Sequence, residues 1–132
     1  MNKFAKRLIK LSNRSNNACL VLGHGFGQLG DVASVFKTVF VFNDSGKTIK
    51  LRNIIHRENL DRITDIGDIE FILIDLDHTQ YLRNCIPLWI KNQCLVLVEQ
   101  NDCLERPAAL PLWENGYRAV EQHGFYHVWK RL

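Results

Sequence analysis

The stretch ACLVLGHGFGQLGD, residues Ala18–Asp31, decides the fold together with FILIDLDHT, residues Phe71–Thr79. Each stretch begins as an apolar run of strand length and breaks abruptly, the first into glycines and the second into paired acids. Apolar runs of this kind are typical of buried parallel strands. Because open α/β sheets bind ligands at the carboxyl ends of such strands, the pair predicts a nucleotide-type ligand on the glycine loop. Chemistry or recognition is expected beside the acids.

The other apolar segments extend this pattern along the chain. Strands are predicted at 18–23, 38–42, 51–56, 69–76, 94–98, 117–122 and 125–130, and helices at 2–12, 28–37, 59–63, 79–91 and 104–115. The loop between the last two strands is too short for a crossover, so they are expected to pair as an antiparallel hairpin. The prediction is a minimal α/β fold with a Rossmann-like, mostly parallel sheet, flanked by helices and closed by a C-terminal antiparallel hairpin.

The connection between the second and third predicted strands is short. It has about ten residues, fewer than a helical crossover between parallel strands normally needs, so the usual helix is predicted to be reduced or absent. An exposed apolar sheet face would result, and such a face favours a homo-oligomer or a place in a larger assembly.

Length and composition indicate one soluble domain, residues 1–132. The chain is 46% hydrophobic and 23% charged, as expected for a globular protein. No apolar run approaches the length needed to span a bilayer, so no membrane partner is expected. The four cysteines lack CxxC spacing, which favours buried reduced thiols over disulfides or zinc and a cytoplasmic location.

The basic residues are unevenly distributed. Five of the 17 lysines and arginines, and none of the 14 acidic residues, precede Asp31. Residues 1–17 are predicted to form a basic amphipathic helix and a linker, because Phe4, Leu8 and Leu11 recur at helical spacing. This segment is either a solvated face on a docked helix, a patch for nucleic acid or an acidic partner, or a targeting segment.

This layout resembles the class I S-adenosylmethionine-dependent methyltransferases, whose sheet ends in a reversed strand. The segments that carry the resemblance, in chain order, are Val21–Gly27, Ile54–Glu58, Ile72–His78, Pro87–Trp89, Val96–Asp102, Gly116–Val120 and Phe125–Lys130. The third of these is similar to an Ile-Asp-Gly-Asp-His segment found in a branch that acts on small molecules. The ordered set is more specific than a glycine loop alone.

The resemblance implies S-adenosylmethionine as cofactor and methyl transfer to an unidentified, small acceptor. By resemblance, the catalytic residues are Asp77 and His78, and the cofactor-binding residues are Gly23, Gly25, Phe26, Gly27, Asp44, Glu58 and Asp75. The glycine loop would hold the methionine part, Asp44 the ribose and Glu58 the adenine. No metal site is assigned, although Asp77 and Asp102 form a weaker Mg²⁺ candidate.

Several features depart from the family pattern and leave alternatives open. Gly23 stands where the family usually has an acid, and Asp44 is either a ribose ligand or part of a turn. Asp77 is equally well explained as the cap of a following helix, and Glu58 as a surface acid paired with a nearby arginine. The alternative function is therefore a non-catalytic structural or interaction module of the same fold, in which Phe26, Phe42 or His24 fills the cleft. A nucleic-acid-binding accessory protein is the third possibility.

Overall fold

The computed structural model describes residues 3–11, 18–60, 69–87, 89, 93–99 and 105–132. The strands are β1 (Ala18–Leu22), β2 (Thr38–Phe42), β3 (Ile54–His56), β4 (Phe71–Ile74), β5 (Leu95–Glu99), β6 (Tyr117–His123) and β7 (Tyr126–Arg131). The α-helices are α1 (Lys3–Leu11), α2 (Leu29–Val35) and α4 (Glu105–Glu114), and the 3₁₀ helices are η1 (Gly25–Gly27) and η3 (Leu76–Cys85).

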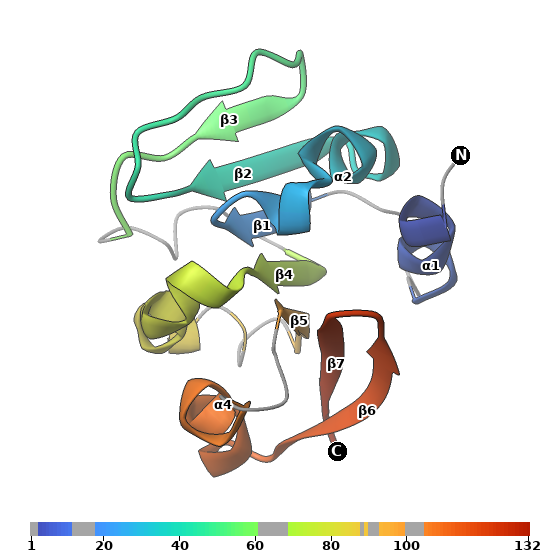
Figure 1. Ribbon diagram of the computed structural model, residues 1–132, viewed down its shortest axis with the longest axis vertical. Helices are drawn as coiled ribbons and strands as arrows, with labels where there is room; N and C mark the ends of the chain where they lie inside the picture. Colours follow the sequence, from blue (N-terminus) through green and yellow to red (C-terminus); the bar gives the residue numbers. More distant parts are fainter. Residues whose placement is uncertain (1–2, 12–17, 61–68, 88, 90–92, 100–104) are drawn as a thin grey trace.

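The described strands form one seven-stranded sheet in the order β3-β2-β1-β4-β5-β7-β6. The first five strands of this order are parallel, and β7 runs antiparallel to both β5 and β6. The mostly parallel sheet with its C-terminal hairpin (Figure 1) confirms the predicted fold class. The centre of the sheet, β1 and β4, delivers the glycine loop and the paired acids side by side.

Helices cover both faces of the sheet, because the central strands β1 and β4 are apolar and buried at every residue and so present apolar side chains to both faces. On one face, α1 and α2 pack against a cluster that includes Cys19, Val21 and Phe71. On the other face, η3 and α4 contribute to a cluster built on Leu20 and Ile72.

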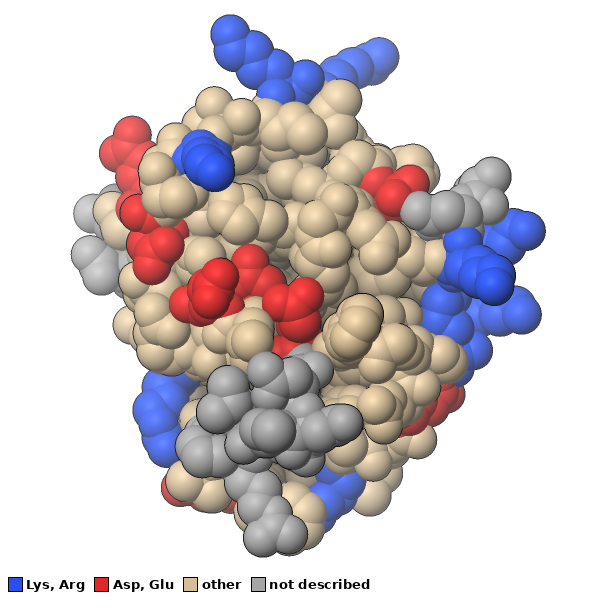
Figure 2. Space-filling view, in the orientation of Figure 1, with Lys and Arg blue, Asp and Glu red and all other residues tan. Residues whose placement is uncertain are grey.

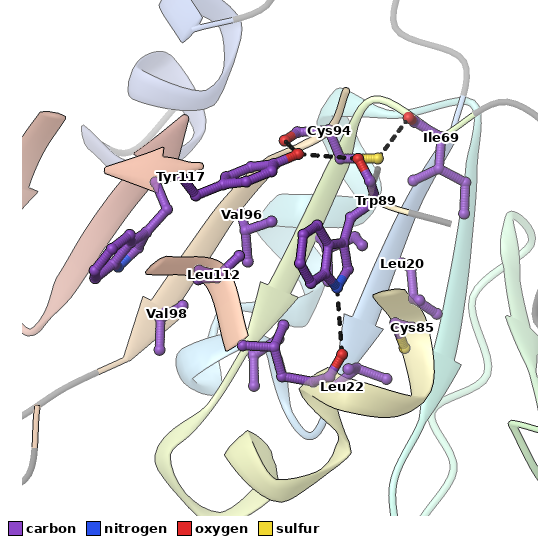
Figure 3. Close-up of a cluster of buried hydrophobic side chains, with 14 of the residues drawn as sticks. Leu20, Leu22, Ile69, Cys85, Trp89, Cys94, Val96, Val98, Leu112 and Tyr117 are labelled. Atoms are coloured by element: carbon purple, nitrogen blue, oxygen red, sulfur yellow. Dashed lines mark hydrogen bonds between the residues drawn. The ribbon is translucent and has the colours of Figure 1, made fainter. Parts of the chain in front are cut away.

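Trp89 and Tyr117 lie within the second cluster (Figure 3). The Trp89 Nε1–H donates to the Leu82 carbonyl at 3.2 Å, and the Tyr117 hydroxyl lies 2.9 Å from the carbonyls of Trp89 and Cys94. Burial raises the pKa of Tyr117 and raises that of Cys85 to about 12. The three described cysteines are buried and free, as the sequence predicted.

Several element boundaries differ from the predictions, and the fourth strand, predicted at 69–76, is limited to Phe71–Ile74. The third strand is shorter than 51–56, because the Ile54 N–H donates to the Leu51 carbonyl and closes a turn. The helix predicted from residue 79 begins at Leu76 and is 3₁₀ up to Cys85. Of the helix predicted at 59–63, residues 59–60 are not helical and 61–63 lie outside the described residues.

Two further findings concern helices that the described residues lack. Residues 43–53 connect β2 to β3 without a helix, as predicted from the length of this connection. Among the described residues, no helix has both the length and the apolar character needed to cross a membrane.

Candidate functional site

The glycine loop begins directly after β1 and follows an unusual backbone path. The φ angle is +112° at Gly23, +60° at Gly25, +59° at Phe26 and +76° at Gly27. L-residues pay about 1–2 kcal/mol for this left-handed region, whereas glycine does not. The sequence therefore supplies glycine at three of these four positions.

Phe26 is the exception, and its ring is held by aromatic neighbours. It stacks on Tyr126 of β7 with ring centroids 5.4 Å apart, and Phe4 of α1 meets its edge at 6.0 Å. These contacts stabilise the strained residue and dock α1 against the loop. The Phe26 side chain therefore packs toward α1, and only the backbone of this residue is available for contact with a ligand.

The side of the loop that faces β4 is filled by Asp75. A Cβ at position 23 would overlap the Asp75 carboxylate. This carboxylate is buried, accepts the His24 N–H at 2.9 Å, and lies 2.7 Å from Nδ1 of His78. Glycine is therefore required at position 23, because Asp75, the residue directly after β4, occupies the space that a side chain there would take.

His78 extends these contacts to the end of β2. Its ring is buried, and its Nε2 lies 3.3 Å from the backbone nitrogen of Asp44 and 3.2 Å from Asp44 Oδ1. The Tyr81 hydroxyl donates to Asp44 Oδ2 at 3.3 Å. A neutral ring that donates from Nδ1 to Asp75 can accept the Asp44 N–H at Nε2. We call Gly23, Asp75, His78, Asp44 and Tyr81 the inner network.

The opposite side of the loop is open. A cleft of about 240 Å³ lies between the glycine loop and the β2–β3 connection, and it contains no acidic lining residue. It is lined by His24, Gly27, Leu29, Gly30, Asn43, Lys47, Thr48, Ile49 and His56. A Cβ on Gly27 or Gly30 would meet no atom within 4 Å, so the backbone there is accessible to a ligand.

The structure divides the predicted site residues into three groups. Gly23, Asp75, His78 and Asp44 come together in the inner network. Gly27 lines the cleft. Gly25 and Phe26 lie between these two groups along the loop, and Gly25 is buried.

The two remaining acids lie elsewhere. Asp77 is exposed in the first turn of η3 and does not cap it, because the N-cap position is Asp75 and makes no side-chain cap bond. Glu58 is exposed beyond β3, and neither acid lines the cleft. The described residues contain no group of three metal-ligating side chains, and Asp102 lies outside them.

The sequence reasoning missed the far wall of the cleft. Lys47, Thr48 and Ile49 belong to the β2–β3 connection, which was interpreted only as a turn and a missing helix. His56 holds this wall, since its Nε2 lies 3.1 Å from the nitrogen and 3.2 Å from the oxygen of Ile49. The available signal was the position of His56 at the carboxyl end of a predicted strand.

The scaffold alternative predicted that Phe26, Phe42 or His24 would fill the cleft. Phe26 packs toward α1, and Phe42 is buried against Tyr81 at 5.0 Å. His24 is exposed and lines the cleft without closing it. The cleft therefore stays open, although it faces the β2–β3 connection and not Asp77.

Comparison with solved structures finds the same fold in several enzymes, methyltransferases among them. The chain aligns over 98% of its length with precorrin 8w decarboxylase from Methanobacterium thermoautotrophicum, covering 90% of that chain at a TM-score of 0.65 and 12% identity. It aligns over 96% with the ribosomal protein L11 methylase of Lactobacillus delbrueckii subsp. bulgaricus, covering 76% of that chain at a TM-score of 0.64 and 16% identity.

A larger enzyme shares the fold over part of its length. Against MycE methyltransferase from the mycinamycin biosynthetic pathway, 97% of this chain aligns at a TM-score of 0.63 and 12% identity, but it spans only 44% of that enzyme. No family model matches the chain, and no curated protein matches it significantly. The class I methyltransferase fold is thus established by structure, at sequence identities too low to carry function.

Proposed function

We propose that this protein binds S-adenosylmethionine in the cleft beside the glycine loop and transfers its methyl group to a small acceptor. The observation that carries the proposal is the open backbone at Gly27, where an added Cβ would meet nothing within 4 Å. This opening lies in the loop that follows the carboxyl end of β1, in a fold shared with methyltransferases. Glycine at such a position permits close approach of a ligand.

The residues that would hold the cofactor lie on both walls of the cleft. Gly27 and Gly30 would contact its methionine part, and Asn43, which lines the cleft directly after β2, would bind the ribose. When bound, the cofactor supplies an activated methyl group, so the chain's part is mainly positioning. Asp77 is proposed as the acceptor's base; it does not line the cleft, so the acceptor would have to bind between the cleft and this exposed acid after β4.

The second candidate is a non-catalytic module of the same fold, and three observations favour it. The Asp44 carboxylate accepts the Tyr81 hydroxyl and lies 3.2 Å from His78 Nε2, inside the inner network. The cleft wall has no acid for the ribose hydroxyls. Its volume of about 240 Å³ is below the roughly 300–1,000 Å³ of typical small-molecule sites. This candidate predicts that the fold persists while the cofactor does not bind.

Thermal unfolding with and without S-adenosylmethionine or its demethylated product distinguishes the two candidates. A ligand at a hundred times its dissociation constant adds about 2.7 kcal/mol to stability, which raises the midpoint visibly. Gly27→Asn tests the position, because asparagine tolerates left-handed φ while its side chain blocks the cleft. Gly116→Asn is the matched control, since Gly116 also has positive φ and open space but lies at the start of the hairpin.

The proposal expects a midpoint increase in the unmodified chain and in Gly116→Asn, and a much smaller one in Gly27→Asn. No increase at millimolar ligand in the unmodified chain would overturn cofactor binding and leave the non-catalytic module. Equal increases in both variants would show that the cofactor binds elsewhere.

A further inference from the structure

We infer that the exposed lysine stripe of α1 binds the phosphate backbone of a nucleic acid. The stripe consists of Lys3, Lys6 and Lys10, all exposed on the same short helix. In Figure 2 basic side chains gather over α1 at the right of the view, whereas acidic side chains gather near its centre. This surface is separate from the candidate cofactor cleft, so the inference does not depend on the proposed function.

The helix geometry aligns the three lysines. At about 100° per residue, Lys3, Lys6 and Lys10 fall within an arc of about 60°. This arc lies opposite Phe4, Ala5 and Leu8, the buried face of α1. The lysines are spaced by about 4.5 and 6 Å along the axis, which suits successive contacts along one phosphate strand.

The fold itself does not use this stripe. The ion pair that docks α1 is made with Glu121 of β6 by Arg7, which borders the stripe but does not belong to it. None of the three lysines forms an ion pair with a residue in the described ranges, and α1 contains no acid. Like charges three and four residues apart destabilise a helix, and an anionic partner would remove this repulsion.

The surroundings of the stripe favour a nucleic acid over other anionic partners. A membrane surface binds a helix through its apolar face, but that face of α1 is buried under the fold. A protein interface needs large apolar or aromatic anchors, and Ile9 is the one exposed large apolar residue within α1. A row of lysines with little apolar surface is suited to phosphate groups, which lysine binds as a point charge.

The predicted binding is weak, independent of sequence and sensitive to salt. Three phosphate contacts to a single strand give a slope of about −2 for log K against log salt concentration, or about a 20-fold loss of affinity between roughly 50 and 200 mM. The measurement is fluorescence anisotropy of a labelled oligo-uridylate titrated with the full chain across that salt range.

The test variant replaces Lys3, Lys6 and Lys10 by glutamine, which has similar helix propensity. The matched control replaces Lys50, Arg52 and Lys130 by glutamine, removing the same charge from exposed positions outside α1. The α1 variant should lose most of the affinity and salt dependence, while the control retains both. Equal thermal midpoints for the two variants verify that α1 remains docked, and a Lys6→Glu variant gives an independent reading if the triple variant unfolds.

Three outcomes would overturn the inference: no binding at low salt, equal loss in both variants, or binding to vesicles of anionic lipid or to poly-glutamate in place of the oligonucleotide. Cofactor-induced thermal shifts of the same variants are expected to be unchanged. Failure at α1 is therefore distinguishable from failure of the proposed function.

Discussion

The two sides of the glycine loop differ in their surroundings, although each side contains a glycine with positive φ. On the inner side, Gly23 has no room for a side chain because the buried Asp75 carboxylate occupies that space. On the outer side, Gly27 faces open space at the cleft. The first glycine is explained completely by packing within the protein, and the second is not. The difference indicates a rigid inner network and an outer cleft that is open to solvent.

Gly23→Ala should give the largest effect. Its Cβ would overlap the Asp75 carboxylate at a residue that also has positive φ, so overpacking and backbone strain add to about 3 kcal/mol of lost stability. Gly27→Ala meets only the strain of its φ and should cost about 1 kcal/mol. Urea unfolding measures both. Equal losses would show that Asp75 moves aside easily and that the two sides do not differ in rigidity.

A double-mutant cycle sharpens the same comparison. Removing the carboxylate by Asp75→Ala leaves room for a Cβ at position 23, so the cost of Gly23→Ala should fall from about 3 to about 1 kcal/mol in that background. The coupling energy of about 2 kcal/mol is in the range expected for residues in direct contact. The cycle is measured by urea unfolding of the four proteins, with Gly27→Ala in the Asp75→Ala background as control. Additive effects at positions 23 and 75 would contradict the contact.

The sequence predicted the sheet because buried strands have a local signature. The apolar runs of β1 and β4, and the tight turn before β7, each depend on residues close together in the chain. The inner network could not be predicted in this way. His78 reads as a candidate base after a strand, but its burial and its contacts with Asp75 and Asp44 come from the packing of three strand ends.

The missing acid at position 23 illustrates the same limit. From the sequence alone, Gly23 weakens the resemblance, because the acid expected there is absent. The structure shows a carboxylate from Asp75, 52 positions further along the chain, in the space beside Gly23. Leu22 pairs with Ile74 in the parallel register of β1 and β4, so the residues that follow them, Gly23 and Asp75, are neighbours. This proximity can be seen only once the strand register is known.

Lys47 tests the charge of the outer cleft. S-adenosylmethionine carries one more positive charge than its demethylated product, so a lysine in the lining should disfavour the cofactor relative to the product. Lys47→Ala should therefore raise the ratio of cofactor affinity to product affinity about twofold. This change corresponds to about 0.5 kcal/mol, as expected for an exposed pair of charges. Calorimetric titration of both ligands measures the ratio, and Lys50→Ala is the control outside the lining. An unchanged ratio would place the charged part of the ligand away from Lys47.

Asp77→Asn should have the smallest effect on stability, because this acid is exposed and belongs to neither side of the loop. Unfolding should stay within about 0.5 kcal/mol of the unmodified chain, and the cofactor-induced midpoint shift should be unchanged. A general base contributes about 10²–10⁴-fold to rate, so methyl transfer to an acceptor should fall while binding persists.

His78→Gln is the comparison variant for Asp77→Asn. It removes a buried ring that lies between Asp75 and Asp44, and should lower stability by about 1–3 kcal/mol. If Asp77→Asn destabilised the protein as much as His78→Gln, Asp77 would have a structural part in the inner network, and its assignment as the acceptor's base would be wrong.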